Sequence, residues 1–158
     1  MVNFRTQRLI AADAPVARQL FQLMAQVFEE PAAPLSDAYL VRLLSRAEFW
    51  AIAAFAGDDL IGGLTAHTLP MTSSESSEIF IYDIAVRSDR QRQGVGRQLI
   101  SALQVAAQAQ GIENIFVPAD NDDSHALDFY RALGGEPASV THFTFPGRRT
   151  SLDEDERS

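Results

Sequence analysis

The sequence predicts an α/β (α+β) domain, in which a mixed, mostly antiparallel central sheet is flanked by about four helices. Apolar runs with strand composition alternate with segments of helical spacing along the chain. Two neighbouring runs, Phe49 to Phe55 and Leu60 to Leu69, are joined by Gly57-Asp58-Asp59, the pattern of an antiparallel hairpin. The run Glu78 to Val86 carries apolar side chains on both faces, as a central strand covered on both sides does.

The N-terminal region should contribute an edge strand and two helices. Phe4 to Ile10 has the composition of a short edge strand. Asp13 with Pro15 then marks the start of a helix whose apolar spacing continues to about Phe28. After a proline-containing break, Ser36 can cap a second helix, because its hydroxyl can accept a hydrogen bond from a first-turn N–H.

After the central strand the order helix, strand, short helix, strand is predicted, over residues 94–110, 112–117, 123–133 and 140–145. Gly111 supplies the left-handed residue that ends the first of these helices. Asp123 or Ser124 caps the second, and Gly134-Gly135 ends it. Residues 1–147 should therefore form a single domain, and residues 148–158, ending in SLDEDERS, should form a polar, disordered tail.

Composition excludes several functions. The 158 residues carry a net charge of -8, which disfavours nucleic acid and anionic membranes and favours a cationic partner. There is no cysteine, so disulfides, thiolate metal sites and a cysteine nucleophile are excluded. His67, His125 and His142 lack the spacing of a ligand cluster, and we predict no metal. Without a signal-peptide core or an apolar span, a cytoplasmic location is expected.

The turn Gln91-Arg92-Gln93-Gly94-Val95-Gly96-Arg97 lies between the central strand and the next helix. Such a turn leaves the first-turn N–H groups unpaired, and the helix dipole adds positive charge there. Gly94 and Gly96 let a phosphate approach the backbone, and Arg90, Arg92 and Arg97 add charge, so a pyrophosphate would suit this site. A plain turn that uses glycine for its dihedral angles is the alternative. The Gly-Lys-Ser/Thr phosphate loop and the third glycine of a dinucleotide fingerprint are both missing.

The same segment, preceded by Ile84-Ala85-Val86, resembles the Gln/Arg-x-x-Gly-x-Gly/Ala signature of the GCN5-related N-acetyltransferases (GNAT). The order of elements from about Phe4 to Phe145 is similar as well. A closer resemblance, to the type I aminoglycoside 3-N-acetyltransferases, is carried by FWAIAAF (49–55), SEIFIYDIAV (77–86), RQG (92–94), FVPAD (116–120), Tyr130 and His142-Phe143.

The resemblance implies acetyl-coenzyme A as cofactor and acetyl transfer to the 3-amino group of a gentamicin-class antibiotic, which confers resistance. It also implies a homodimer, to which the exposed apolar residues of the predicted last strand point. The residues expected at the coenzyme are Ile84, Ala85, Val86, Gln91, Arg92, Gln93, Gly94, Val95, Gly96 and Arg97.

Two residues are candidates for proton transfer, because an acceptor bound as its ammonium must lose a proton and a leaving thiolate needs an acid. Asp83 is acidic within an apolar strand, where burial would raise its pKa. In the enzymes that the chain resembles, the matching aspartate acts on the substrate amine as base or anchor. Its alternative is a strand-end aspartate bonded to backbone or to an arginine. Tyr130 matches a tyrosine that similar enzymes place beside the coenzyme sulfur, and packing against Phe129 and Leu133 is its alternative. A backbone N–H near Ile84 to Val86 is expected to hold the thioester oxygen.

Acidic residues should gather at the acceptor, because a polyamine sugar carries several ammonium groups. Asp120 is the main anchor, since it matches the Ala-Asp of the resembling enzymes, whereas Asp123 could instead cap the short helix. The acceptor-site residues predicted are Glu29, Glu30, Glu78, Tyr82, Asp83, Asp120, Asp123 and His142. Asn121 stands where those enzymes commonly have tyrosine, and Phe143-Thr144-Phe145 lacks an expected acid, which affects drug range more than the reaction.

Two other functions share the coenzyme turn. One is an acetyltransferase for polyamines, peptide N-termini or small metabolites. The other is a catalytically silent acyl-coenzyme A sensor, against which the presence of both Asp83 and Tyr130 argues.

Overall fold

The computed structural model describes residues 3–148. The predicted disordered tail therefore lies, beyond Arg148, outside the described residues. Contacts divide the chain after Asp120 into two compact units, and we describe each by itself.

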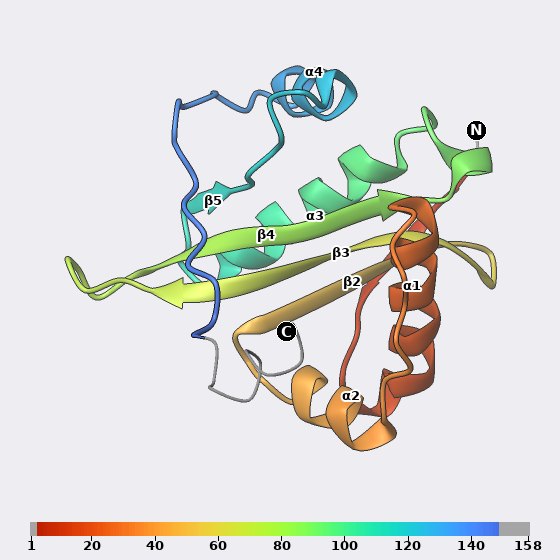
Figure 1. Ribbon diagram of the computed structural model, residues 1–158. Helices are drawn as coiled ribbons and strands as arrows, with labels where there is room; N and C mark the ends of the chain where they lie inside the picture. The colour runs from red at the N-terminus through yellow and green to blue at the C-terminus, as the bar shows by residue number, and fades with distance from the viewer. Residues whose placement is uncertain (1–2, 149–158) are drawn as a thin grey trace, which may run out of the picture. The chain divides into compact units, whose positions relative to one another are not determined.

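The first unit is built on a five-stranded sheet with strand order β1-β2-β3-β4-β5 (Figure 1). Its strands are β1 (Arg5–Arg8), β2 (Phe49–Ala56), β3 (Asp59–Pro70), β4 (Ser77–Val86) and β5 (Asn114–Phe116). The first four strands pair antiparallel, and β5 pairs parallel with β4. The predicted mixed, mostly antiparallel sheet is confirmed.

Three helices of this unit cover the sheet: α1 (Ala14–Val27), α2 (Asp37–Leu44) and α3 (Val95–Ala109). The predicted cap at Ser36 is present, because its Oγ accepts a hydrogen bond from Tyr39 N at 3.1 Å. Gly111 has a φ of 73° and ends α3 as predicted. Two short 3₁₀ turns, η1 (Ala11–Asp13) and η2 (Ser88–Arg90), precede α1 and follow β4.

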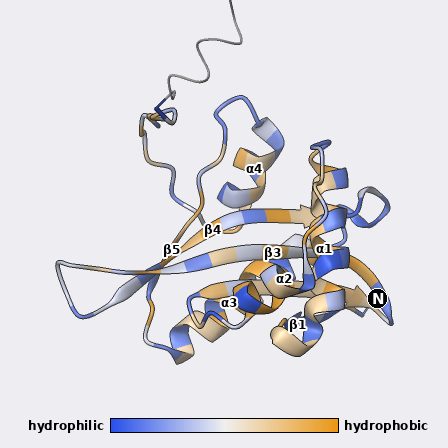
Figure 2. Cartoon of the chain, turned by 60° about the horizontal axis from the view of Figure 1, so that its bottom comes forward, coloured by the Kyte–Doolittle hydropathy of each residue, from blue (hydrophilic) through white to orange (hydrophobic). Residues whose placement is uncertain are grey.

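The two faces of the sheet bury different sets of side chains. One face packs against α1 and α2 in a cluster formed by Phe49, Ala51, Ala53, Phe55, Ala85, Leu20, Met24, Leu40 and Leu44. Strand alternation turns Trp50 and Ile81 to the opposite face, where α3 buries Leu99 and Leu103. Figure 2 shows hydrophobic residues on the strands and on the helices, whereas the connection between β3 and β4 is largely hydrophilic. Burial of both apolar faces is the main source of stability for such a layered unit.

Gly63 allows α1 to approach the sheet closely. A Cβ on Gly63 would lie 2.5 Å from Leu20 Cδ1 and 2.7 Å from the carbonyl oxygen of Ile52. Contacts this short are not tolerated, so the position requires glycine while α1 keeps its place over β3 and β4.

The second unit contains α4 (Ser124–Ala132) and the chain that follows it. Asp123 caps α4, and Gly134, with a φ of 90°, ends it, as predicted. The predicted last strand at residues 140–145 is wrong, because residues 136–148 form no strand in the described chain. Its large apolar side chains are exposed, with Phe145 at 91%. Alternating apolar residues do not form a strand unless a partner strand supplies the ladder hydrogen bonds.

Candidate active site

A β-bulge in β4 places Asp83 on the face of the sheet that carries α1 and α2. Ile81 pairs with Ala66 and Asp83 pairs with Thr65, so Tyr82 is the extra residue on β4. In a regular strand Asp83 would share a face with Ile81, which is buried on the α3 side. The bulge reverses this alternation and turns Asp83 toward α1.

Asp83 is a half-buried carboxyl group whose pKa is raised. Desolvation by burial is the larger cause, and the negative charge of Glu30 is the second. The charged neighbour that acts on the pKa of Asp83 is a carboxylate rather than an arginine. A carboxylate that is desolvated and repelled by another acid is a stronger base and a good site for an ammonium group.

The end of α1 brings Glu30 to this position. Glu30 N donates to Ala25 O at 2.9 Å and Glu29 N donates to Gln26 O at 3.2 Å, which is a Schellman motif. Glu29 occupies its left-handed position with a φ of 55°, where glycine is usual. The motif ends the helix and directs the chain so that Glu30 acts on Asp83.

The C-terminal half of β4 has an open edge on the side away from β3. β5 pairs only with Glu78, Ile79 and Phe80. Arg87 N donates to Ile61 O on β3 at 2.8 Å, so by alternation the N–H groups of Ile84 and Val86 point away from β3. The N–H of Ala85, by the same alternation, points toward β3. Two edge donors are therefore presented in the region where the sequence predicted a donor for the thioester oxygen.

The turn that follows β4 opens α3 with a set of uncapped amides. Gln98 N makes the first helical bond to Gly94 O at 3.0 Å, so the N–H groups of Val95, Gly96 and Arg97 precede the ladder. Gly94 has a φ of 88° and supplies no side-chain cap. Free amides at a helix N-terminus are suited to an anion, and the exposed residues Arg92 and Arg97 belong to the same turn.

An ionic network fixes the chain just before this turn. Arg87 Nη2 lies 3.0 Å from Asp59 Oδ2, and Arg87 Nε lies 2.6 Å from Asp89 Oδ1. Its hydrogen bonds hold the pKa of both carboxyl groups below their usual range. Arg90, predicted as an anion ligand, also reaches Asp59, at 4.0 Å. The predicted coenzyme residue Gln91 donates through Nε2 to Val86 O at 3.1 Å, which ties the turn back to β4.

The remaining predicted acceptor residues occupy different places. Glu78 lies on β4 and accepts a hydrogen bond from Asn114 Nδ2 at 2.9 Å. Asp120 is an exposed residue at the end of the first unit. Asp123 takes its alternative role, since its Oδ1 accepts from Ala126 N at 3.1 Å as the cap of α4. His142 is exposed in the second unit.

Tyr130 lies on α4 in the second unit, and its ring packs beside Phe129 with centroids 5.2 Å apart. This contact is one that the packing alternative predicts. It leaves the proposed role of the hydroxyl group untested.

Sequence reasoning predicted Tyr82 at the acceptor but missed the aromatic rings that contact it. Tyr82 lies in ring contact with His67 and Phe80, whose centroids are each 5.9 Å away. The three residues come from two strands that only the register of β3 against β4 brings together. The one available signal was the Phe-x-Tyr-Asp spacing within β4.

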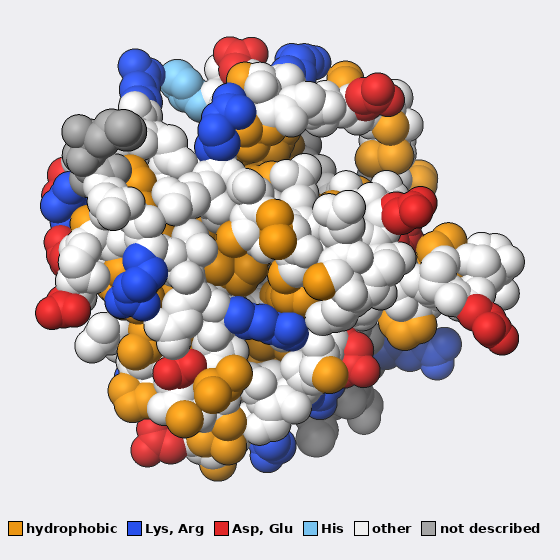
Figure 3. All heavy atoms as spheres, turned by 180° about the vertical axis from the view of Figure 1, so that it is seen from behind, with side chains coloured by type: hydrophobic (Ala, Val, Ile, Leu, Met, Phe, Trp, Pro, Cys, Tyr) orange, Lys and Arg blue, Asp and Glu red, His pale blue; other side chains and the backbone are white. Residues whose placement is uncertain are grey.

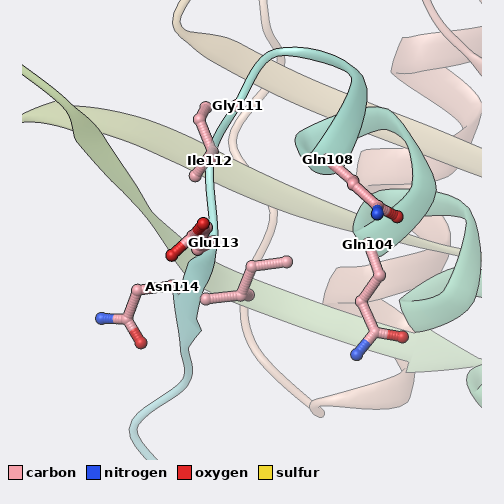
Figure 4. A pocket seen from close by; sticks show the side chains of 7 residues that line it. Gln104, Gln108, Gly111, Ile112, Glu113 and Asn114 are labelled. Carbon is pink, nitrogen blue, oxygen red and sulfur yellow. The ribbon is translucent and has the colours of Figure 1, made fainter.

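A separate hollow lies at the far end of α3 (Figure 4). Gln104 and Gln108 of α3 line it together with the segment that leads into β5, residues 111–115. The 15 residues of α3 span about 22 Å, so this hollow is remote from the amides that open the helix. It shares no residue with the candidate active site among the described residues.

The acidic surplus of the chain does not form a single patch on the face seen in Figure 3, where acidic side chains are spread around the rim. Residues 3–148 contain no group of three or more His, Asp or Glu side chains that could hold a metal ion. Within the same residues, no helix is both long enough and apolar enough to cross a membrane.

Known proteins share this architecture. In sequence, the chain is similar to a curated protein, the uncharacterized N-acetyltransferase YvbK of Bacillus subtilis (strain 168). The two are 28% identical over 127 residues, which are 80% of this chain and 74% of YvbK. The structure is similar to that of aminoglycoside acetyltransferase meta-AAC0020 from an uncultured soil metagenomic sample, solved with trehalose, at a TM-score of 0.88. That match is 35% identical and covers 92% of this chain and 97% of the other. The same enzyme with sisomicin matches at 34% identity.

A second aminoglycoside acetyltransferase from an uncultured soil metagenomic sample, HMB0005, matches with a TM-score of 0.88 and 31% identity, over 92% of this chain and 99% of the other. The family model described as "Acetyltransferase (GNAT) family" matches residues 17–134. Because that match spans most of the chain and includes β4, the turn and α3, this protein belongs to the acetyltransferase (GNAT) family.

Proposed function

We propose that this protein transfers the acetyl group of acetyl-coenzyme A to the 3-amino group of a gentamicin-class aminoglycoside and so confers resistance. One observation carries the proposal. The β4 bulge turns Asp83 toward α1, burial and the charge of Glu30 raise its pKa, and β4 leads directly into the turn whose free amides suit an anion. A carboxyl group in these surroundings can bind a cationic acceptor and can also accept a proton from the acceptor's ammonium group.

Proteins of this family use acetyl-coenzyme A, and the residues present suit it. The uncapped amides of Val95, Gly96 and Arg97 would hold the pyrophosphate. The outward N–H groups of Ile84 and Val86 would hold the pantetheine arm and the thioester oxygen. When bound, the coenzyme supplies the acetyl group as a thioester.

Asp83 has two tasks in this proposal. Its carboxylate first binds the acceptor as an ammonium ion, and it then accepts one proton from that nitrogen, directly or through a water molecule. Loss of the proton gives the amine the lone pair that it needs to attack the acetyl carbon. The negative charge of Glu30 favours both tasks, since it attracts the ammonium and raises the pKa of Asp83.

We assign the second proton transfer to Tyr130, whose hydroxyl group would donate its proton to the sulfur as the carbon–sulfur bond breaks. This role rests on the resemblance of Tyr130 to the tyrosine of similar enzymes. Unchanged turnover in Tyr130→Phe would leave only its packing against Phe129.

The acceptor class is supported by the relatives. The similar enzyme meta-AAC0020 was solved with sisomicin, an aminoglycoside, and also with trehalose, a sugar without ammonium groups. In this chain, the carboxylates of Glu30, which follows α1, and of Glu78 and Asp83 on β4 would bind the ammonium groups of such an acceptor. Asp120 is a further anchor in this proposal.

Thiol release tests the proposed function. Purified protein is supplied with acetyl-coenzyme A and with gentamicin, kanamycin, spermidine or a lysine peptide as separate acceptors. We expect thiol release with gentamicin. Mass spectrometry should show one added acetyl group, and NMR should place it on the 3-amine. Asp83→Asn should abolish this release while the protein stays folded.

The other outcomes decide between the alternatives. Release with spermidine or the peptide but not with gentamicin would keep the acetyltransferase and reject the antibiotic. Binding of the coenzyme without release from any acceptor would reject transfer and favour an acyl-coenzyme A sensor.

A further inference from the structure

A continuous row of aromatic rings crosses four strands on the face that carries Asp83. Successive centroids lie 5.4 Å apart for Phe49 and His67, 5.9 Å for His67 and Tyr82, 5.9 Å for Tyr82 and Phe80, and 5.3 Å for Phe80 and Phe116. These five residues, hereafter the aromatic row, come from β2, β3, β4 and β5. All of them belong to the first unit.

Core packing does not explain the whole row. Phe49 is buried in the cluster with α1 and α2, but Tyr82 is 63% exposed and Phe116 is 39% exposed. Phe80, between these two exposed rings, and His67 are half-buried. Partly exposed apolar rings that continue one another on a sheet face are typical of a binding surface rather than of a core. Saturated sugar rings present C–H groups that pack against such rings, and ammonium groups are attracted to their faces.

A carboxylate stands at each end of the part of the row that lies on β4. Asp83 pairs with Thr65 and Glu78 pairs with Leu69, which places both on the same face, four residues of β3 apart. The strand rise makes this separation roughly 13 Å. Asn114 Nδ2 donates to the Glu78 carboxylate at 2.9 Å, which draws this carboxylate toward β5, the strand that also carries Phe116.

We infer that the aromatic row and Glu78 form a second acceptor subsite. It would select an elongated polyammonium molecule with saturated rings: one ammonium at Asp83, ring faces on Tyr82, Phe80 and Phe116, and a second ammonium at Glu78. The inference rests on the proposed function, which it extends from the reacting amine to the distal rings. Charge complementarity with the two carboxylates is the reason for choosing a polyammonium occupant over a neutral sugar or a second copy of the chain.

Steady-state kinetics with a long and a short acceptor test the inference. Gentamicin reaches both ends of the row, whereas 2-deoxystreptamine, a single ring, occupies only the Asp83 end. Glu78→Gln should raise the KM for gentamicin about tenfold, the loss of one charge-assisted hydrogen bond, and should leave kcat and the KM for 2-deoxystreptamine within twofold. Phe116→Leu should act in the same direction by about threefold.

Glu113→Gln is the matched control, because it removes the same charge from an exposed position next to Asn114 and adjacent to β5. It should change neither KM. Equal changes for both acceptors, or equal changes in Glu78→Gln and Glu113→Gln, would overturn the subsite.

Calorimetric binding of gentamicin separates this inference from the proposed function. If no acceptor is acetylated but Glu78→Gln still weakens gentamicin binding about tenfold, the subsite stands and the proposed transfer fails. If gentamicin is acetylated and Glu78→Gln changes nothing, the proposed function stands and the subsite is overturned. Absence of both binding and transfer would overturn the two together.

Discussion

Glu30, at the end of α1, raises the pKa of Asp83, at the bulge of β4. Asp83 is half-buried and Glu30 is exposed, and both causes that act on the pKa of Asp83, burial and the charge of Glu30, disfavour its carboxylate. A carboxylate that burial and a like charge both disfavour destabilises the folded protein, and such a group is retained where a cationic ligand completes it. Substitutions of Glu30 and Asp83 therefore test the site directly.

Removal of the Glu30 charge should lower the pKa of Asp83. Glu30→Gln leaves burial as the remaining cause of the upward shift, so the pKa should move toward its usual value without reaching it. Carboxyl NMR titration, with Asp83→Asn used to assign the resonance, measures the change. Glu29→Gln removes the same charge one residue away and should have little effect. A shift of equal size in both variants would mean that net charge, rather than the position of Glu30, acts on Asp83.

Asp83→Asn should be inactive and yet more stable than the parent at neutral pH. Because burial and Glu30 raise the folded-state pKa above its usual 3.8, the folded state binds this proton more tightly than the unfolded chain. The free energy of unfolding therefore falls as pH rises from 3.8 through the raised pKa, and the asparagine variant avoids that loss. Melting temperatures across pH 3 to 8 should diverge as pH rises.

Turnover by Asp83→Asn should fall at least about 100-fold. Asp58→Asn, at an exposed turn position, should change neither activity nor the pH dependence of melting. A destabilised Asp83→Asn protein would show that Asp83 has a structural partner instead.

Glu29→Gly should stabilise the protein. Glu29 holds the left-handed position of the Schellman motif, with a φ of 55°, and a side chain there costs about 1 kcal/mol relative to glycine. Urea unfolding should show a gain near that size, with an unchanged m-value. Glu30→Gly is the contrast, because Glu30 does not have a positive φ and glycine would only add freedom to the unfolded chain. Stabilisation of both variants alike would assign the effect to charge rather than to backbone strain.

Local signals predicted most of the elements. The hairpin at Gly57, the cap at Ser36 and the stop at Gly111 depend on residues near one another in the sequence, and all three are present. The prediction of a strand at residues 140–145 was wrong. Alternation of apolar and polar residues shows only that a segment could pair, whereas actual pairing depends on another segment of the chain.

The bulge at Tyr82 could not be predicted from the sequence. β4 has apolar side chains on both faces, so a reversal of alternation leaves no visible break in its pattern. The position of Asp83 opposite Glu30, and the aromatic row from four strands, both depend on that reversal and on strand register. The charge of a polyamine acceptor led us to expect Glu30 and Asp83 at one site, whereas only the structure could reveal the aromatic row.

Gly63→Ala should destabilise the protein by about 1–3 kcal/mol, because the added methyl group would overlap Leu20 Cδ1 and the Ile52 carbonyl oxygen. Both neighbours belong to packed elements, so α1 or β2 would have to move. Gly147→Ala is the control, since nothing lies within 4 Å of the added Cβ, and it should stay within about 0.5 kcal/mol of the parent. Chemical unfolding measures both. A neutral Gly63→Ala would show that α1 adjusts its distance from the sheet freely.

Gly94→Ala should weaken coenzyme binding more than it weakens the fold. Gly94 has a φ of 88° at the start of α3, and an alanine there would either strain the backbone or reorient the amides of the first turn. Gly57→Ala provides the comparison, because Gly57 also has a positive φ, of 61°, and neither added Cβ would have a neighbour within 4 Å. Both variants should lose about 1 kcal/mol of stability.

Calorimetric titration with coenzyme A separates the two variants. Gly94→Ala should raise its Kd about tenfold, whereas Gly57→Ala should leave it unchanged. The KM for the acceptor should stay constant in both, since Asp83 lies on β4 and Glu30 lies just after α1, and neither belongs to the turn. Equal coenzyme affinity in the two variants would mean that the left-handed residue serves only to turn the chain from β4 into α3, and that the anion is held elsewhere.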